Sequence, residues 1–202
     1  MKPGFFLLLL FFCAAGDGLG QSPPRPRFGK LTPADFNDNG FNRSDSSAGA
    51  VIIADIGSTE IVGNDKSGFS LEFNTYRRAR ILNRNGFGIA VVEIPVYTDG
   101  DLEEDLRTIR AVTYNLENGR VVQTRVNPRT SVFKNRIDKN RIVRRFTFPN
   151  VKEGSIIEYE YRLKSDFMFN LRAWDFQGAY PVRWSEYKVA IPEFYNYVIL
   201  SQ

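Results

Sequence analysis

The stretch Arg141–Leu163 constrains the fold most, because apolar and polar residues alternate in two runs within it. Successive side chains of a β-strand point to opposite faces, so this alternation predicts strands with one buried face. The apolar positions are Ile142, Phe146 and Phe148, and then Ile157, Tyr159, Tyr161 and Leu163. Turn-forming residues separate the runs: Pro149, Asn150 and Gly154. The stretch therefore predicts an antiparallel hairpin that pairs Phe146 with Ile157 and Arg145 with Glu158.

Further runs of strand character follow one another at short spacing along the rest of the chain. They cover residues 48–56, 59–62, 69–82, 88–97, 106–114, 120–126, 182–191 and 195–200. Asn118-Gly119 is the clearest hairpin signal, and Gly57-Ser58 predicts a turn between the first two runs. No helical periodicity is sustained. Roughly nine or ten strands with turn signals between them predict an all-β fold, an antiparallel β-sandwich.

The residue types that are missing exclude several chemistries. The 202 residues contain no histidine, and the only cysteine is Cys13. We therefore expect no Cys-His or Ser-His-Asp catalysis, no disulfide, no zinc site and no cofactor. With 27 basic and 23 acidic residues the net charge is +4, which does not indicate nucleic-acid binding. Carboxylate catalysis stays open, as in a glycosidase with two opposed acids.

The N-terminus has the pattern of an export signal. A positive start, Met1-Lys2, precedes the apolar run Phe5–Ala15, which is too short to span a bilayer comfortably. We expect a signal peptide over residues 1–20, and an uncleaved anchor is the alternative. The mature protein would then lie in the periplasm, the cell envelope or outside the cell, without stable membrane insertion.

Residues 21–46 are expected to be a linker and lead-in segment. Gln21–Lys30 is rich in proline and predicts an extended, mobile linker. Thr32 and Pro33 favour one helical turn after it. The β-sandwich domain is expected over residues 47–202. Because the apolar run 195–200 almost reaches the end of the sequence, we expect that the chain is a truncated piece of a longer domain.

Two acidic loops partly match calcium loops, and one basic run could bind polyanions. In Asp35–Gly40 the match fails at the twelfth position, and in Asp99–Asp105 it fails at the sixth, so a turn and a solvated loop are favoured. The basic run consists of Arg77, Arg78, Arg80 and Arg84. A solvated strand face is the favoured interpretation of this run, with polyanion binding as the alternative.

The segment 165–187 holds most of the candidate binding residues, because it is the part of the chain richest in aromatic residues. Trp174, Tyr180 and Trp184 could form a ligand or partner surface. Such aromatic sets more often pack in a core, so we expect Trp174 and Trp184 to be buried. An exposed flat row of these rings would instead indicate stacking on sugars.

The stretch Phe148–Phe194 resembles domain of unknown function 3857, which precedes transglutaminase-like domains in bacterial envelope proteins. The matching residues are Phe148-Pro149, Val151, Gly154-Ser155, Ile157-Glu158-Tyr159, Tyr161, Ser165-Asp166, Trp174, Phe176-Gln177, Pro181, Ser185-Glu186-Tyr187 and Ile191-Pro192. Upstream, Ala50–Asp55 and Arg80-Ile81-Leu82 with Gly86 also fit. The resemblance implies a β-sandwich module of an exported protein.

The same resemblance implies no catalytic residue for this chain. Relatives carry a papain-like Cys-His-Asp domain after the sandwich, and no matching residues exist here. We therefore expect a non-catalytic accessory or interaction domain whose partner is a transglutaminase-like domain or an envelope protein. The alternatives are a carbohydrate-binding module and a β-sandwich adhesin.

Overall fold

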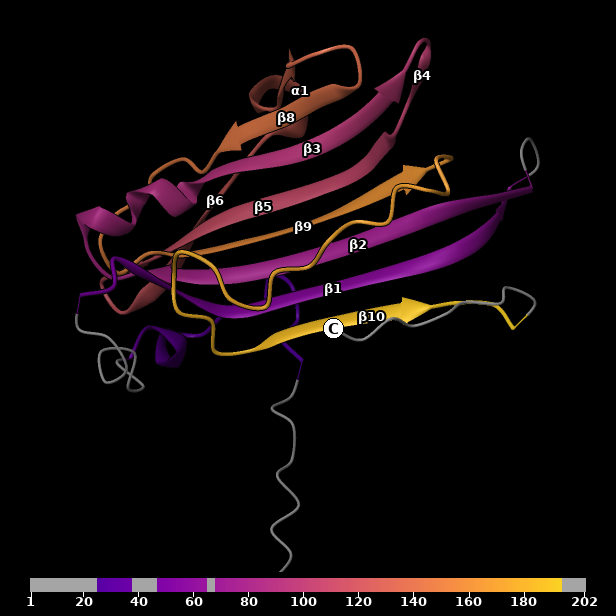
Figure 1. Ribbon diagram of the computed structural model, residues 1–202. Coiled ribbons are helices and arrows are strands. Elements are labelled where there is room, and N and C mark those ends of the chain that lie inside the picture. The colour runs from indigo at the N-terminus through magenta and orange to yellow at the C-terminus, as the bar shows by residue number, and fades with distance from the viewer. Residues whose placement is uncertain (1–24, 38–46, 65–67, 194–202) are drawn as a thin grey trace, which may run out of the picture.

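The computed structural model of the protein describes residues 25–37, 47–64 and 68–193. Ten strands form a six-stranded and a four-stranded sheet. Figure 1 shows the smaller sheet stacked on the larger, which confirms the predicted all-β sandwich. The predicted signal peptide, residues 1–20, and the apolar run 195–200 lie outside the described residues. Within the described ranges, no helix has the length and apolar character needed to cross a membrane.

The larger sheet has the strand order β10-β1-β2-β9-β5-β6. Its strands are β1 (Ala50–Asn64), β2 (Gly68–Ile81), β5 (Asp105–Glu117), β6 (Arg120–Arg125), β9 (Ile156–Ser165) and β10 (Ser185–Ala190). All neighbours are antiparallel except β1 and β10, which run parallel, so the expectation of a wholly antiparallel sandwich was wrong at this edge. The parallel pair arises because the segment 166–184 returns along the sheet before β10 begins.

The smaller sheet has the order β4-β3-β8-β7. Its strands are β3 (Val91–Asp99), β4 (Leu102–Glu103), β7 (Phe133–Arg136) and β8 (Arg141–Thr147). In the described part of the chain, three short helical turns lie outside the sheets: η1 (Pro33–Phe36), η2 (Arg84–Ala90) and α1 (Pro128–Ser131). The main core fills the space between the sheets, where Ile94 and Phe146 of the smaller sheet meet Ile157 and Tyr159 of the larger.

The stretch Arg141–Leu163 forms both predicted strands, β8 and β9, but they do not pair with each other. β8 pairs with β3 and β7, whereas β9 pairs with β2 and β5. The connecting loop crosses between the sheets and is held on the larger one, since Thr113 Oγ1 donates to the carbonyl of Pro149 at 2.7 Å. The two apolar faces therefore meet across the core, where Phe146 packs edge-on against Tyr159 with ring centroids 6.1 Å apart.

The predicted turn at Gly57-Ser58 is also absent, because β1 continues through both residues. A Cβ atom at Gly57 would lie 2.4 Å from Trp174 Cζ3 and 2.7 Å from Tyr187 Cδ2. The glycine therefore makes room for two aromatic rings on the inner face of the sheet. By contrast, the hairpin predicted at Asn118-Gly119 is confirmed, with positive φ values of 50° and 74° between β5 and β6.

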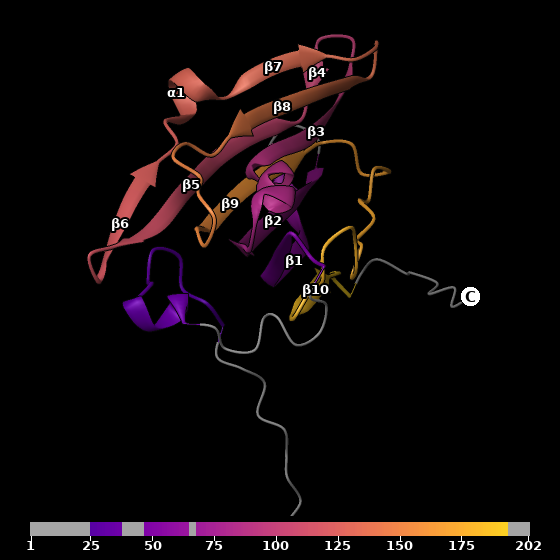
Figure 2. The ribbon, with the colours of Figure 1, turned by 90° about the vertical axis from the view of Figure 1, so that its left-hand side faces the viewer.

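The lead-in segment packs on the outer face of the larger sheet. Figure 2 shows it below the sheet, on the side opposite the smaller sheet. Phe36 of the predicted helical turn is buried against Val112, Tyr114 and Ile156. Asp35 accepts hydrogen bonds from Thr32 N at 2.6 Å and from Thr32 Oγ1 at 2.9 Å. The expectation of a mobile linker was therefore wrong for residues 25–30, since Gly29 is bonded to the sheet.

Candidate functional site

The basic run on β2 is neither a solvated face nor an open polyanion surface. Arg77 reaches Asp55 Oδ2 at 2.5 Å on the inner face of the sheet. Arg78 reaches Glu158 Oε1 at 2.6 Å on the outer face, under the lead-in segment. Arg80 donates to the carbonyl oxygens of Phe36 and Asn37 at 2.6 and 2.8 Å. Both interpretations are therefore corrected for these three arginines, which tie strands and segments together. Arg84, on η2, is 86% exposed and pairs with Glu153 at 3.3 Å, as a solvated residue does.

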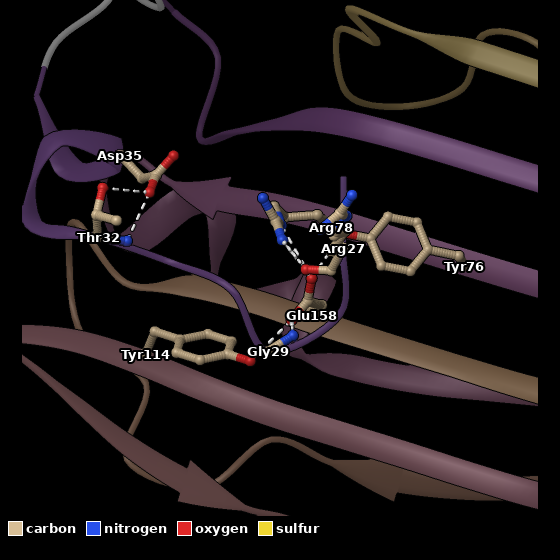
Figure 3. A network of polar contacts seen from close by, with 8 residues as sticks. All are labelled: Arg27, Gly29, Thr32, Asp35, Tyr76, Arg78, Tyr114 and Glu158. Carbon is tan, nitrogen blue, oxygen red and sulfur yellow. Dashed lines mark hydrogen bonds and ion pairs between the residues drawn. The ribbon is translucent and has the colours of Figure 1, made fainter. Parts of the chain in front are cut away.

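Glu158 is the centre of a buried hydrogen-bond network (Figure 3). Its carboxylate accepts from Tyr76 Oη at 2.6 Å, Arg78 Nη2 at 2.6 Å, Arg78 Nε at 3.0 Å, Tyr114 Oη at 2.7 Å and Gly29 N at 2.8 Å. Arg78 Nη2 also donates to the carbonyl of Arg27 at 3.1 Å. The network therefore joins three strands of the sheet to the lead-in segment.

The two tyrosines of this network act as protonated donors. Burial, followed by the neighbouring Glu158 carboxylate, raises the pKa of Tyr76 and of Tyr114 well above the ordinary value of a phenol. Both carboxylate oxygens of Glu158 already accept hydrogen bonds from these fixed donors, so the side chain is engaged within the fold. We assign the network a structural role: it fastens the lead-in segment to the sheet.

A cleft between the two sheets is the best candidate for a binding site. It is a cavity of about 830 Å³ between the edge of β3 and the inner face of β1, β2 and β9. The segment 166–184 runs across this face between β9 and β10 (Figure 1) and closes one side of the cavity. The contacts that hold the segment in place include Arg172 Nη2 donating to Glu104 Oε2 at 2.5 Å and Trp174 Nε1 donating to Ser185 Oγ at 3.0 Å.

The floor of the cleft is charged and aromatic. The Asp55–Arg77 pair lies beside Tyr159, and all three line the cavity. Burial lowers the pKa of Arg77, but Tyr159 and Asp55 outweigh it, so the pKa is raised and the guanidinium stays charged. Trp174 stacks on Tyr187 with centroids 4.8 Å apart and an interplanar angle of 22°. Tyr187 is fixed in turn by a hydrogen bond between its hydroxyl and that of Thr59.

The mouth of the cleft is apolar and open to solvent. Ile137 and Leu171 line it and are 57% and 49% exposed. Phe169 is 75% exposed, and its ring lies edge-on to Tyr97 with centroids 5.7 Å apart. Pro95, on the free edge of β3, completes this rim, and Arg172 Nη2 donates to its carbonyl at 2.8 Å. Proline and arginine together block strand addition at this edge.

The three aromatic residues predicted from the sequence are not brought together in one row. Trp174 lines the large cleft, Tyr180 lines a neighbouring cavity of about 390 Å³, and Trp184 lines neither of the two. All three are half-buried, so the expectation that Trp174 and Trp184 are buried was wrong in degree. The exposed flat row that would indicate sugar stacking is absent for these three residues.

The acidic loop Asp99–Asp105 is engaged in ion pairs. Glu103 contacts Lys134 and, at 2.9 Å, Arg144. Partial burial opposes ionisation of Glu103, but these two cations outweigh it and lower its pKa. Within the described ranges, no cluster of three or more His, Cys, Asp or Glu side chains could hold a metal ion. Of the other calcium-like loop, residues 38–46 lie outside the described part.

Sequence reasoning missed the buried ion pairs that shape the cleft and the outer face. The carboxylates are Asp55, Glu104 and Glu158, which are 2%, 2% and 0% exposed. A signal was present for Asp55, because a charged residue inside an apolar strand run must find a partner when the run is buried. Its partner could not be identified, since the strand pairing that places Arg77 opposite Asp55 is not encoded locally.

The fold defines an all-β sandwich as the structural class of this protein, and comparisons agree with this fold. A family model described as a domain of unknown function with a solved structure, DUF3857, matches residues 69–199. The protein belongs to this family. No curated protein matches the chain.

One solved structure shows the same fold in a larger protein. It is the crystal structure of a protein from Parabacteroides distasonis described as a "putative protease". It is 12% identical, with a TM-score of 0.53 over 72% of this chain. The match covers 29% of that protein, so this chain spans less than a third of its length.

Proposed function

We propose that this protein is a non-catalytic interaction domain of an exported, transglutaminase-like protein, where it binds a partner beside the catalytic part. The observation that supports the proposal most is that the buried carboxylates are engaged in ion pairs within the fold. Asp55, Glu104 and Glu158 are each held by an arginine at 2.5–2.6 Å. Such a charge-assisted contact fixes each carboxylate within the fold, whereas a catalytic carboxylate must be placed to contact a substrate.

Two further facts support this proposal. The sequence contains no histidine, and its one cysteine, Cys13, belongs to the expected signal peptide. The structural relative from Parabacteroides distasonis contains the sandwich as a minor part of a longer chain. Under this proposal the domain contributes binding and positioning, and the chemistry comes from another part of the protein.

The first test is an activity assay on the purified chain. Casein hydrolysis and incorporation of dansylcadaverine into casein should both stay at background. Turnover that scales with the amount of chain and is lost in Asp55→Asn would refute the proposal.

The second test concerns the partner. A transglutaminase-like domain from a family relative that contains both parts in one chain is added to this chain, and complex formation is followed by sedimentation velocity. We expect a complex of the two. Independent sedimentation at micromolar concentrations would argue against this class of partner.

Export is part of the proposal and has its own test. The chain, expressed with its N-terminus intact, should be recovered from the periplasm or the medium. Its mature N-terminus should be Gln21, as Edman sequencing would show. Recovery from the cytoplasm with Met1 retained contradicts this.

A further inference from the structure

We propose that the inter-sheet cleft binds an acidic segment of a partner protein, which inserts one large apolar side chain between the sheets. This inference deepens the proposed function and rests on it, because it names the surface and the chemistry by which the interaction domain recognises its partner.

The cavity itself provides the site for the apolar side chain. Its inner walls include Phe73, Val96 and Ile142, which belong to a buried apolar cluster. Tyr161 and the stacked Trp174 complete these walls. Fully desolvated pockets with aromatic walls at the centre of an interface are where single anchor residues contribute most to binding. A phenylalanine or leucine side chain suits the chemistry of these walls, and the cavity of about 830 Å³ has room for it together with part of the segment that carries it.

The rim shows that the partner has an apolar surface of its own around this anchor. Ile137, Leu171 and Phe169 come from two segments far apart in the sequence, and each is about half exposed or more. Pro95 extends the same rim from β3. Single exposed apolar residues need no explanation, but a contiguous group around a cavity mouth marks an interaction site.

The charge next to the mouth indicates the sign of the charge on the partner. The β7–β8 hairpin, residues 133–145, carries six Lys or Arg residues and one carboxylate, Asp138. Its Arg141 lines the cleft and pairs with Asp138 at 2.6 Å. The cleft lining itself holds three arginines and three carboxylates, so the excess of charge lies on the hairpin beside it. The carboxylates that contact this hairpin are few, Glu93, Glu103 and Asp138, so the hairpin keeps an excess of positive charge. Carboxylates on the partner would complement it and steer the encounter.

The apolar rim distinguishes a protein segment from a nucleic acid or a sugar. A phosphate backbone gains little from Leu171 and Ile137, because its affinity comes from cations. A sugar needs an open ring face, whereas Trp174 stacks on Tyr187 and packs over Gly57. An acidic peptide with an apolar anchor uses the cavity, the rim and the charge together.

The test uses a fluorescein-labelled peptide, Glu-Glu-Phe-Leu-Glu-Glu, and a counterpart in which lysine replaces each glutamate. Fluorescence anisotropy with the full chain should show saturable binding of the acidic peptide, at least about tenfold tighter than that of the lysine peptide. The affinity should fall as salt rises. An oligonucleotide or cellobiose that displaces the peptide would assign the cleft to another ligand class and overturn the proposal.

Variants locate the binding. Three variants change the cleft: Leu171→Ser removes an apolar rim residue, Arg141→Glu reverses a charge, and Ala173→Trp fills the mouth. Each should weaken peptide binding by about tenfold or more. Matched controls are Leu116→Ser, Lys152→Glu and Gln177→Trp, which change exposed residues that do not line the cleft. Thermal melts should be unchanged, because the substituted residues are exposed.

The inference is overturned if the variants and the controls lose the same amount of peptide affinity, or if the acidic peptide shows no saturable binding. Failure of the proposed function is a separate result, since it would appear as turnover in the activity assay and not as absence of peptide binding.

Discussion

The buried carboxylates show at residue scale how this sandwich tolerates charge in its interior. Among the described residues, Asp55, Glu104 and Glu158 are buried, and each faces an arginine. Breaking such a pair leaves an uncompensated charge, which costs far more than the intact pair contributes. The three pairs therefore fix positions of chain segments: Arg77 on β2, Arg172 on the crossing segment and Arg78 under the lead-in.

Glu158→Gln removes the charge from the centre of the outer network while it keeps the shape of the side chain. We expect a loss of about 3 kcal/mol in the free energy of unfolding, because Arg78 stays buried without its counter-ion. Urea denaturation measures this. Glu160→Gln, two residues along the same strand, is the control, since its partner Arg110 is 57% exposed and the change should cost less than about 1 kcal/mol. Equal effects of the two variants would show that the network is not a structural centre.

Gly57→Ala tests the close packing of aromatic rings on β1. The new methyl group would meet Trp174 and Tyr187, which are both held by hydrogen bonds and cannot move away freely. We expect a cost of about 1–3 kcal/mol and a shift in Trp174 emission, read in a Trp184→Phe background. Gly63→Ala is the control on the same strand, because no atom lies within 4 Å of the added Cβ. A neutral Gly57→Ala would mean that the crossing segment can shift.

At the scale of elements, the sequence predicted correctly the features that depend on contacts between residues close together in the chain. The β5–β6 hairpin was found because Asn118 and Gly119 tolerate positive φ, which the turn requires. The strands β8 and β9 were found by alternation, but their pairing was wrong because the choice of sheet depends on distant strands. Gly57 was misread as a turn because its role is to face Trp174, a residue more than a hundred positions away.

The candidate site was predicted only in part for the same reason. Trp174 was singled out and does line the cleft, whereas Trp184 does not. Asp55, Arg77 and Ile137 converge on the cleft only after both sheets have formed. No spacing rule in the sequence links them.

The lead-in segment is an element without regular structure that nevertheless has a core of its own. Phe36→Ala should reduce the free energy of unfolding by about 3 kcal/mol, because this ring is 8% exposed and fills the space against Tyr114. Limited proteolysis should then cut within residues 25–37. Phe169→Ala is the control, since its ring is 75% exposed and the change should stay within about 0.5 kcal/mol. Full resistance of the Phe36 variant to proteolysis would contradict the assigned role.

At the scale of the whole molecule, the larger sheet is covered on both faces, by the smaller sheet on one side and by the lead-in on the other (Figure 2). Tyrosines are buried on both of these faces. Burial raises the pKa of Tyr159 on the inner face, as it does for Tyr76 and Tyr114 on the outer.

These shifts predict how stability depends on alkaline pH. The folded protein keeps the three phenols protonated above their ordinary pKa of about 10, while the unfolded chain releases those protons. Stability should therefore be fully present below about pH 10 and decline as pH rises further. Tyrosinate absorbance should show one set of tyrosines that titrates rapidly and a second set that ionises only when the protein unfolds. With Tyr76→Phe the second set should become smaller; ionisation of all tyrosines in one step without unfolding would contradict this.

The parallel pairing of β1 with β10 has a consequence for how the protein folds during its synthesis. Asp55 lies opposite Ser185, so the first strand of the sheet acquires this neighbour only after nearly all the described residues have been synthesised. A nascent chain therefore leaves the ribosome with one flank of β1 open, and an open flank can recruit strands from other chains. The solubility of this protein therefore depends on synthesis of residues 185–190. Any expression product that ends before them should accumulate in inclusion bodies.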